Sequence, residues 1–228
     1  GDDHRELSDE LAALELPIYM KHDGSLGDEG VEIVTHPCSL AYHRFDMRWA
    51  EISRICRKHH YTSHEAGTCG LHIHIGRKQM GDNDEAQKAT AAKLVLLVYH
   101  LWEQMVKFSR RTAGQLDDWA KRPDLDYYGY EAGSGYGDDE LVHLALRTRR
   151  SGRYQAVNLC NDATVELRLF RGTLKRGTLI ASVQLASNLT KYAMAHTPKE
   201  CIEANWSDVI GVEQFKELND YCAKMGLC

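Results

Sequence analysis

The sequence lacks the glycine motifs that most often bind nucleotides. No stretch reads GxxxxGK[ST], and no GxGxxG opens a helix after a strand. These absences exclude a P-loop and a Rossmann dinucleotide site. The seven cysteines form no CxxC pair and have no regular spacing. An odd, scattered set of thiols favours reduced cysteines and a cytoplasmic location.

Long hydrophobic runs and an excess of positive charge are also missing. The longest apolar run, Leu94–Tyr99, is too short to span a bilayer, so we expect no membrane partner. The formal net charge of −5 gives no general reason to bind nucleic acid, which is not an expected partner. With 228 residues, 43% of them hydrophobic, the chain suits a single globular domain over residues 1–228.

The hydrophobic patterns predict both strands and helices. Strands are expected at 17–25, 30–37, 69–76, 153–160 and 163–172, where β-branched or alternating apolar residues end at turns. Helices are expected at 8–16, 39–60, 84–111 and 175–196, and again over 199–226 with a break near 206–211. The helical C-terminal part therefore covers 175–228. Because strands and helices do not alternate regularly, we predict an α+β fold with an antiparallel sheet covered by helices.

Two histidines stand one residue apart in the octet CGLHIHIG, at residues 69–76. Since side chains alternate along a strand, His72 and His74 share one face, and Leu71, Ile73 and Ile75 share the other. Paired imidazoles on one face are a frequent arrangement of metal ligands.

Acidic and basic residues interrupt other apolar strands. In TVELRLFR, Glu166 and Arg168 share a face and are costly to bury unless they are paired or bind ligands. Glu32 lies within a β-branched run. In KHDGS we expect Asp23 to be catalytic, and Lys21 and Ser25 to contact a cofactor. Arg171 and the arginines of 147–153 are candidate anion binders.

Carboxylates, an imidazole and several arginines together suit Mg²⁺ or Mn²⁺ holding a nucleotide phosphate. Such ions bridge phosphate oxygens and offset the charge that develops during phosphoryl transfer. If ATP binds, we expect it on a sheet face.

Four segments in this order resemble the amidoligase family: KHDGSLGDEGVEIVTHP, CGLHIHIG, RYQAVNL and TVELRLFRGTL. The resemblance runs from about Lys21 to about Leu174. The family belongs to the carboxylate–amine ligases with a glutamine-synthetase-like fold. It therefore implies a curved antiparallel sheet whose concave face is catalytic.

The resemblance implies an ATP-dependent ligase that joins a carboxylate to an amine through an acyl phosphate. It assigns the metal ligands to Glu32, His72 and Glu166. It places Arg168 and Arg153 against the phosphate or the acyl phosphate. His74 and Arg171 are then expected to contact the cofactor. The acid and the amine can be small molecules, peptides or protein side chains, and a homo-oligomer is possible.

One segment departs from the family pattern. Its members usually begin with a strand of the type GxExE, which supplies further acids to the metal. This sequence starts GDDH, and Glu6, Glu10 and Glu15 follow a helical pattern. We therefore expect either a processed chain or a reduced metal site.

Three other functions fit the same residues. A metalloenzyme without nucleotide can use the His/Glu site. A thiol enzyme can use Cys69, if a bulge at Gly70 turns it toward His72. A binding protein with a degenerate site on the same fold needs no turnover at all.

Overall fold

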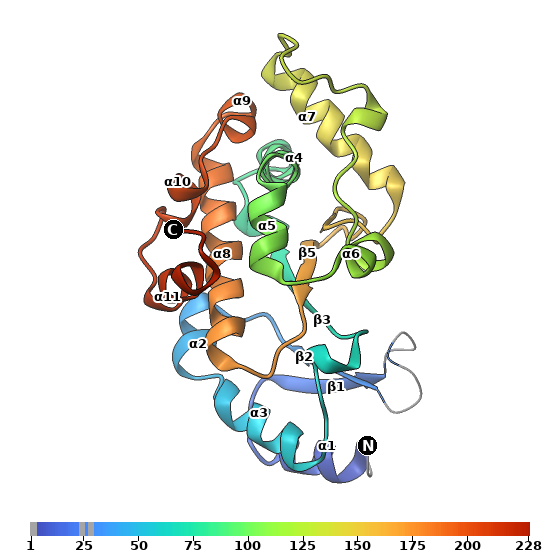
Figure 1. The fold of residues 1–228 in the computed structure, drawn as a ribbon, viewed down its shortest axis with the longest axis vertical. Coiled ribbons are helices and arrows are strands. Elements are labelled where there is room, and N and C mark those ends of the chain that lie inside the picture. Colours follow the sequence, from blue (N-terminus) through green and yellow to red (C-terminus); the bar gives the residue numbers. More distant parts are fainter. Residues whose placement is uncertain (1–3, 23–25, 27–29) are drawn as a thin grey trace. The chain divides into compact units, whose positions relative to one another are not determined.

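The computed structural model describes residues 4–22, 26 and 30–228, and the chain divides into two compact units (Figure 1). The N-terminal unit comprises Gly1–Gly70 and Gly172–Ile180. The larger unit comprises Leu71–Arg171 and Ala181–Cys228. The expectation of one domain over residues 1–228 stays a prediction, and each unit is described by itself below.

A two-stranded antiparallel sheet lies in the N-terminal unit. β1 (Ile18–His22) pairs with β2 (Val31–Thr35), with Ile18 opposite Thr35 and His22 opposite Val31. Both strands lie within the ranges predicted from sequence. The helices are α1 (His4–Ala12), α2 (Leu40–Phe45) and α3 (Trp49–Lys58), and η2 (His64–Ala66) is a 3-10 turn. The core of the unit is built from Leu7, Leu11, Met47, Ile52, Ile55 and Cys56.

Two sequence predictions for this unit were wrong. The helix expected over 8–16 lies earlier in the chain, because α1 begins at His4 and ends at Ala12. The helix predicted over 39–60 is two helices, because Arg48 adopts a left-handed conformation with φ of 49° between them. No glycine or proline marks that break. The hydrophobic periodicity continues across it and therefore predicted a single helix.

The larger unit is built around a three-stranded sheet in the order β3-β5-β4. β3 (Gly70–Gly76) and β5 (Thr164–Arg171) match their predicted ranges. β4 is short (Val157–Asn158) and antiparallel to β5, with Asn158 opposite Glu166. The predicted strand over 153–160 is therefore reduced to its centre. On its N-terminal side, Gln155 instead forms a parallel bridge to Lys121.

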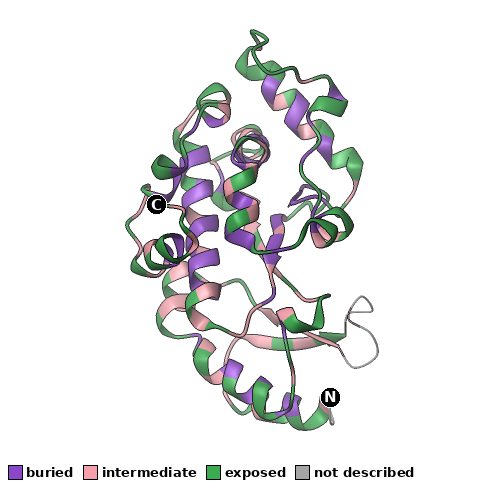
Figure 2. Ribbon diagram, in the orientation of Figure 1, coloured by how far each residue is buried: buried purple, intermediate pink, exposed green. Residues whose placement is uncertain are grey.

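Helices supply most of the larger unit. They are α4 (Asp84–His100), α5 (Trp102–Ser109), α6 (Ala113–Trp119), α7 (Asp138–Arg147), α9 (Pro198–Ile202), α10 (Trp206–Ile210) and α11 (Lys216–Met225). α8 (Arg176–Ala195) begins in the N-terminal unit and continues into this one. The 3-10 turns are η3 (Arg77–Gln79), η4 (Asp126–Tyr128) and η5 (Thr148–Ser151). Figure 2 shows buried residues concentrated along α8 and β5.

Local signals explain where several of these helices start. Asn83 accepts from the backbone N–H of Ala86, and Thr112 forms a capping box with Gln115. The predicted helix over 84–111 breaks at Leu101, which separates α4 from α5. α6 and α7 were not predicted, and α10 occupies the expected break at 206–211.

The α+β class with antiparallel strands is confirmed. The two sheets are small and lie in different units. The single curved sheet with a concave catalytic face stays a prediction. Among the described residues, no helix combines the length and the hydropathy that a membrane crossing requires.

Candidate functional site

β3 presents its two histidines on one face, as the alternation predicted. Leu71, Ile73 and Ile75 pack against the main core of the larger unit. The side chain of His72 is 23% exposed and that of His74 is 49% exposed. His74 Nδ1 lies 3.0 Å from Thr164 Oγ1, so β3 and β5 are linked through side chains at this point.

Glu166 of β5 is the centre of the site. It is almost fully buried, and its Oε1 lies 2.7 Å from Arg168 Nη1. The same oxygen lies 3.2 Å from His72 Nδ1 and 3.7 Å from His74 Nε2. One carboxylate oxygen therefore faces the side chains of His72, His74 and Arg168, all three of which were predicted as site residues from the sequence.

The second oxygen of Glu166 is also occupied. Asn158 on β4 donates from Nδ2 to Glu166 Oε2 at 2.7 Å, while its own Oδ1 accepts from the backbone N–H of Cys160. Sequence reasoning did not identify Asn158. The available signal was its place in RYQAVNL, because a strand paired with β5 puts that asparagine opposite the glutamate.

Arg168 is held from two further directions. Its Nε donates to the backbone carbonyl of Trp119 at 3.3 Å, and its guanidinium carbon lies 5.6 Å from the centre of the Tyr154 ring. These contacts and the bond to Glu166 fix the plane of the guanidinium. The guanidinium of Arg168 is therefore largely shielded from water, and it is paired with a carboxylate.

Burial and positive charge keep His72 neutral. Burial, with the charges of Arg168 and Arg111, lowers the pKa of His72 to about 4, against the opposing charge of Glu166. Arg111 is itself buried, just beyond the end of α5. Positive charge therefore lies close to this imidazole.

No cluster of three or more histidine, cysteine, aspartate or glutamate side chains is arranged to hold a metal within residues 4–22, 26 and 30–228. Two donors of suitable chemistry do meet, namely the imidazole of His72 and the carboxylate of Glu166. Mg²⁺ usually takes one or two carboxylates and completes its shell with water and phosphate. Both oxygens of that carboxylate already face protein donors, so a metal ion at this site stays a prediction.

The remaining predicted site residues fall into three groups. Lys21 and Glu32 belong to the N-terminal unit, where they are opposite each other in β1 and β2. Asp23 and Ser25 lie outside the described residues. Arg153 is exposed and stacks on Tyr154, and Arg171 is the half-buried last residue of β5. The structure thus brings together His72, His74, Glu166 and Arg168 of the predicted set.

The Gly/Tyr-rich segment over 127–137 is tied down by its tyrosines. Tyr136 donates from its hydroxyl to the carbonyl of Gly129 at 2.6 Å and stacks with Tyr130 at 5.7 Å between ring centres. The hydroxyl of Tyr128 lies 2.9 Å from Ser151 Oγ. The segment therefore has specific contacts at both ends and in its middle.

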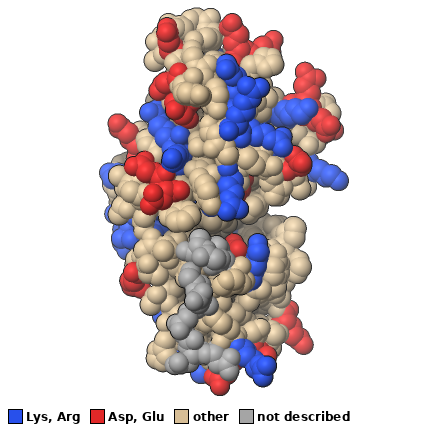
Figure 3. Space-filling model, turned by 90° about the vertical axis from the view of Figure 1, so that its right-hand side faces the viewer, with Lys and Arg blue, Asp and Glu red and all other residues tan. Residues whose placement is uncertain are grey.

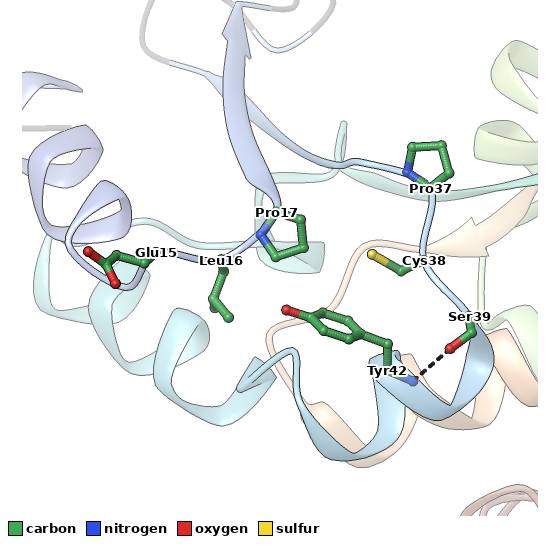
Figure 4. A pocket seen from close by; sticks show the side chains of 7 residues that line it. All are labelled: Glu15, Leu16, Pro17, Pro37, Cys38, Ser39 and Tyr42. Atoms are coloured by element: carbon green, nitrogen blue, oxygen red, sulfur yellow. Dashed lines mark hydrogen bonds between the residues drawn. The ribbon is translucent and has the colours of Figure 1, made fainter.

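A pocket of about 550 Å³ lies in the N-terminal unit (Figure 4). Tyr42 points toward Leu16 and Pro17, and Cys38 lies between Pro37 and the tyrosine ring. Among the described residues, Glu15 is the charged residue of its lining, and no arginine or lysine lines it. A pocket lined by a carboxylate and by no basic side chain does not suit a phosphate, so this is not the candidate site.

Cysteine reactivity tests the burial of the core independently of function. Burial raises the pKa of Cys56 to about 11, and the pKa of Cys201 and of Cys222 to about 12. Thiols with such pKa values carry little thiolate at pH 8 and react slowly. We expect iodoacetamide to modify exposed Cys160 in the native chain, and these three only after unfolding, as read by mass spectrometry. Modification of Cys201 or Cys222 at the rate of Cys160 would contradict the packing described above.

Comparisons with protein-family models, with curated proteins and with solved structures find no match to this chain.

Proposed function

We propose that the protein is an ATP-dependent ligase that joins a carboxylate to an amine. One observation carries the proposal. Residues from separate sequence motifs converge on a single carboxylate oxygen of Glu166, with an imidazole and a guanidinium beside it. These are the residues that the resemblance to the amidoligase family assigns to phosphate and metal binding. The same resemblance leads us to propose a glutamine-synthetase-like fold.

The proposed reaction has two steps. A substrate carboxylate oxygen attacks the γ-phosphorus of ATP, and ADP leaves, which gives an acyl phosphate. The amine nitrogen then attacks the acyl carbon, phosphate leaves, and the nitrogen loses a proton. Arg168 is suited to both steps, because a guanidinium donates charge-assisted hydrogen bonds to the oxygens of a phosphate or an acyl phosphate.

His72 and Glu166 would hold Mg²⁺ or Mn²⁺ in the larger unit, and the role of Glu32, which belongs to the N-terminal unit, stays a prediction from the sequence. The ion supplies positive charge to the phosphate oxygens when it is bound. Arg168 Nη1 lies 2.7 Å from Oε1 of the same carboxylate. Neutral His72 keeps a lone pair for a ligand at physiological pH, since its pKa is lowered to about 4.

Thermal unfolding with Mg²⁺ alone, with ATP alone and with both tests the proposal. A ligand at 100 times its Kd adds about 2.7 kcal/mol to the folded state. For a chain of this size that raises Tm by roughly 5–10 °C. We expect the full shift only when both ligands are present. A shift with metal alone would favour a metalloenzyme without nucleotide, and no shift would favour a degenerate binding protein.

Two histidine variants test whether the thermal shift with Mg²⁺ and ATP arises at β3. His72→Ala removes a proposed ligand, whereas His143→Ala removes an exposed histidine of α7 in the same unit. We expect His72→Ala to lose most of the shift that Mg²⁺ and ATP produce together, and His143→Ala to retain it. An equal shift in both variants would place any nucleotide site away from β3.

A further inference from the structure

The C-terminal end of α11 is closed by a Schellman motif, which turns the chain back along the helix. Gly226 adopts a left-handed conformation with φ of 62°, which costs glycine less than a residue with a Cβ. The backbone N–H of Gly226 donates to the carbonyl of Ala223 at 3.1 Å, and that of Leu227 donates to the carbonyl of Cys222 at 2.9 Å. The residue after Leu227 therefore lies beside the last turns of α11.

That residue is Cys228, and its thiol meets the thiol of Cys222. The two side chains share a hydrogen bond, so their sulfur atoms are neighbours in the folded chain. Both are free thiols, but Cys222 is 0% exposed, whereas Cys228 is exposed to solvent. The cap of one helix therefore holds a buried thiol against an exposed one.

Contacts with α5 keep this turn in place. Tyr221 donates from its hydroxyl to the carbonyl of Phe108 at 3.0 Å, and the two ring centres lie 4.7 Å apart. Lys107 donates from Nζ to the carbonyl of Gly226 at 2.7 Å. Because the helix and the turn are both attached to α5, the two thiols stay side by side. Groups held in this way react with each other much faster than the same groups on separate molecules.

We propose that Cys222 and Cys228 form a reversible redox site, which a peroxide converts into an intramolecular disulfide. The pair is independent of the proposed ligase function. The disulfide would close a loop of seven residues and fix the chain after α11 to the helix itself. The scattered cysteines of the sequence favour a reduced chain, and disulfides in reducing surroundings are usually transient and redox-sensing.

The two thiols have different roles in this oxidation. Burial raises the pKa of Cys222 to about 12, so this thiol carries little thiolate at neutral pH. Cys228 is exposed and is the thiol that peroxide can reach. We therefore assign the first step to Cys228 and the second step to Cys222, which needs no access to solvent because its partner is already beside it.

The reaction balances with hydrogen peroxide as the oxidant. The thiolate of Cys228 attacks one peroxide oxygen, the O–O bond breaks, and the sulfur becomes a sulfenic acid while the other oxygen leaves as water. The sulfur of Cys222 then attacks the sulfur of Cys228, and the S–O bond breaks. The hydroxyl group leaves as water with the proton of the Cys222 thiol. Two thiols and one peroxide give one disulfide and two water molecules.

Tryptic peptide mapping of the full chain tests the proposal. Trypsin cleaves after Lys216 and Lys224, which puts Cys222 in peptide 217–224 and Cys228 in peptide 225–228. The dilute native chain is treated with hydrogen peroxide in slight molar excess. Iodoacetamide then blocks the remaining thiols during unfolding in urea, and digestion follows without reductant. We expect mass spectrometry to find most of peptide 225–228 linked to peptide 217–224, and dithiothreitol to separate the two peptides.

The two exposed cysteines provide matched variants. Cys228→Ser removes one partner without opening the core and should abolish the link, whereas Cys160→Ser makes the same change and should retain it. The thiol of Cys160 contacts the carbonyl of Arg149 in η5, which follows directly from α7. α7 lies on the face seen in Figure 3, where lysine and arginine side chains gather in the upper half. α11 lies on the opposite side of the larger unit in Figure 1, so the control thiol is remote from the pair.

Three results would overturn the proposal. The first is peptide 225–228 that stays unlinked to peptide 217–224 after peroxide treatment. The second is peptide 225–228 that is linked mainly to a second copy of itself, which would show a disulfide between chains. The third is peptide 217–224 that remains linked to another peptide in the Cys228→Ser variant. Since that substitution is at an exposed position beyond the last helix, the variant chain is expected to fold and the comparison stays available.

Discussion

Replacing Glu166 with alanine is expected to lower the free energy of unfolding by about 3–5 kcal/mol, the usual cost of removing one partner of a buried charge pair. Glu166 is only 4% exposed, and Arg168 lies against it with a side chain that is 13% exposed. The alanine variant leaves that guanidinium without its carboxylate, and it also leaves the amide of Asn158 without its acceptor. Urea denaturation of the full chain measures the loss.

A surface pair provides the control for this prediction. Glu213 pairs with Lys191, and both side chains are at least 40% exposed. Glu213→Ala is expected to cost less than about 1 kcal/mol, because water screens exposed pairs. The double variant Glu166→Ala/Arg168→Ala should be less destabilised than the sum of its single variants, since it removes the stranded charge. Equal effects at Glu166 and Glu213 would show that the pair on β5 is not buried.

The same contacts change the result that we expect for the Glu166→Gln variant. From the sequence alone, this variant is expected to abolish metal-supported ATP binding without unfolding the chain. In the structure the amide cannot neutralise Arg168, so we also expect a loss of stability of about 1–3 kcal/mol. His72→Ala is therefore the cleaner test of the nucleotide site, because His72 is partly exposed and uncharged at neutral pH.

The strands could be predicted because their patterns are local. Alternation placed His72 with His74 and Glu166 with Arg168 before any tertiary contact was known, and β3 and β5 occupy the predicted ranges. Burial of one face fixes such a register strongly. Helix boundaries were predicted less well, because the breaks at Leu101 and Arg48 carry no glycine or proline.

The parts of the site that were missed depend on contacts distant in sequence. Trp119 reaches Arg168 through its backbone carbonyl, which has no side-chain signature. Asn158 and Arg111 become relevant only once β4 and the end of α5 are placed beside β5. Arg147 belongs to the basic run 147–153 noted in the sequence, but its stacking on Tyr128 of another segment could not be predicted from spacing.

Truncating Phe108 to alanine is expected to destabilise the larger unit by about 3–5 kcal/mol, the range for a buried phenylalanine. Phe108 is 1% exposed and joins three elements through its ring. Ring centres lie 4.7 Å away at Tyr221, 5.9 Å at Phe170 and 6.2 Å at Trp206. Alanine leaves a cavity between β5, α10 and α11. The tightly packed neighbours cannot move far enough to fill it, so part of their van der Waals contact is lost.

Phe45→Ala is the matched control for the Phe108 variant, because it makes the same chemical change at a side chain that is 70% exposed. We expect its free energy of unfolding to stay within about 0.5 kcal/mol of the unchanged chain. Circular dichroism during urea denaturation measures both variants. If Phe108→Ala also cost less than 1 kcal/mol, the aromatic cluster would not be packed as described. β5 would then lack its support from α5, and the position of Glu166 beside His72 would no longer follow from the fold.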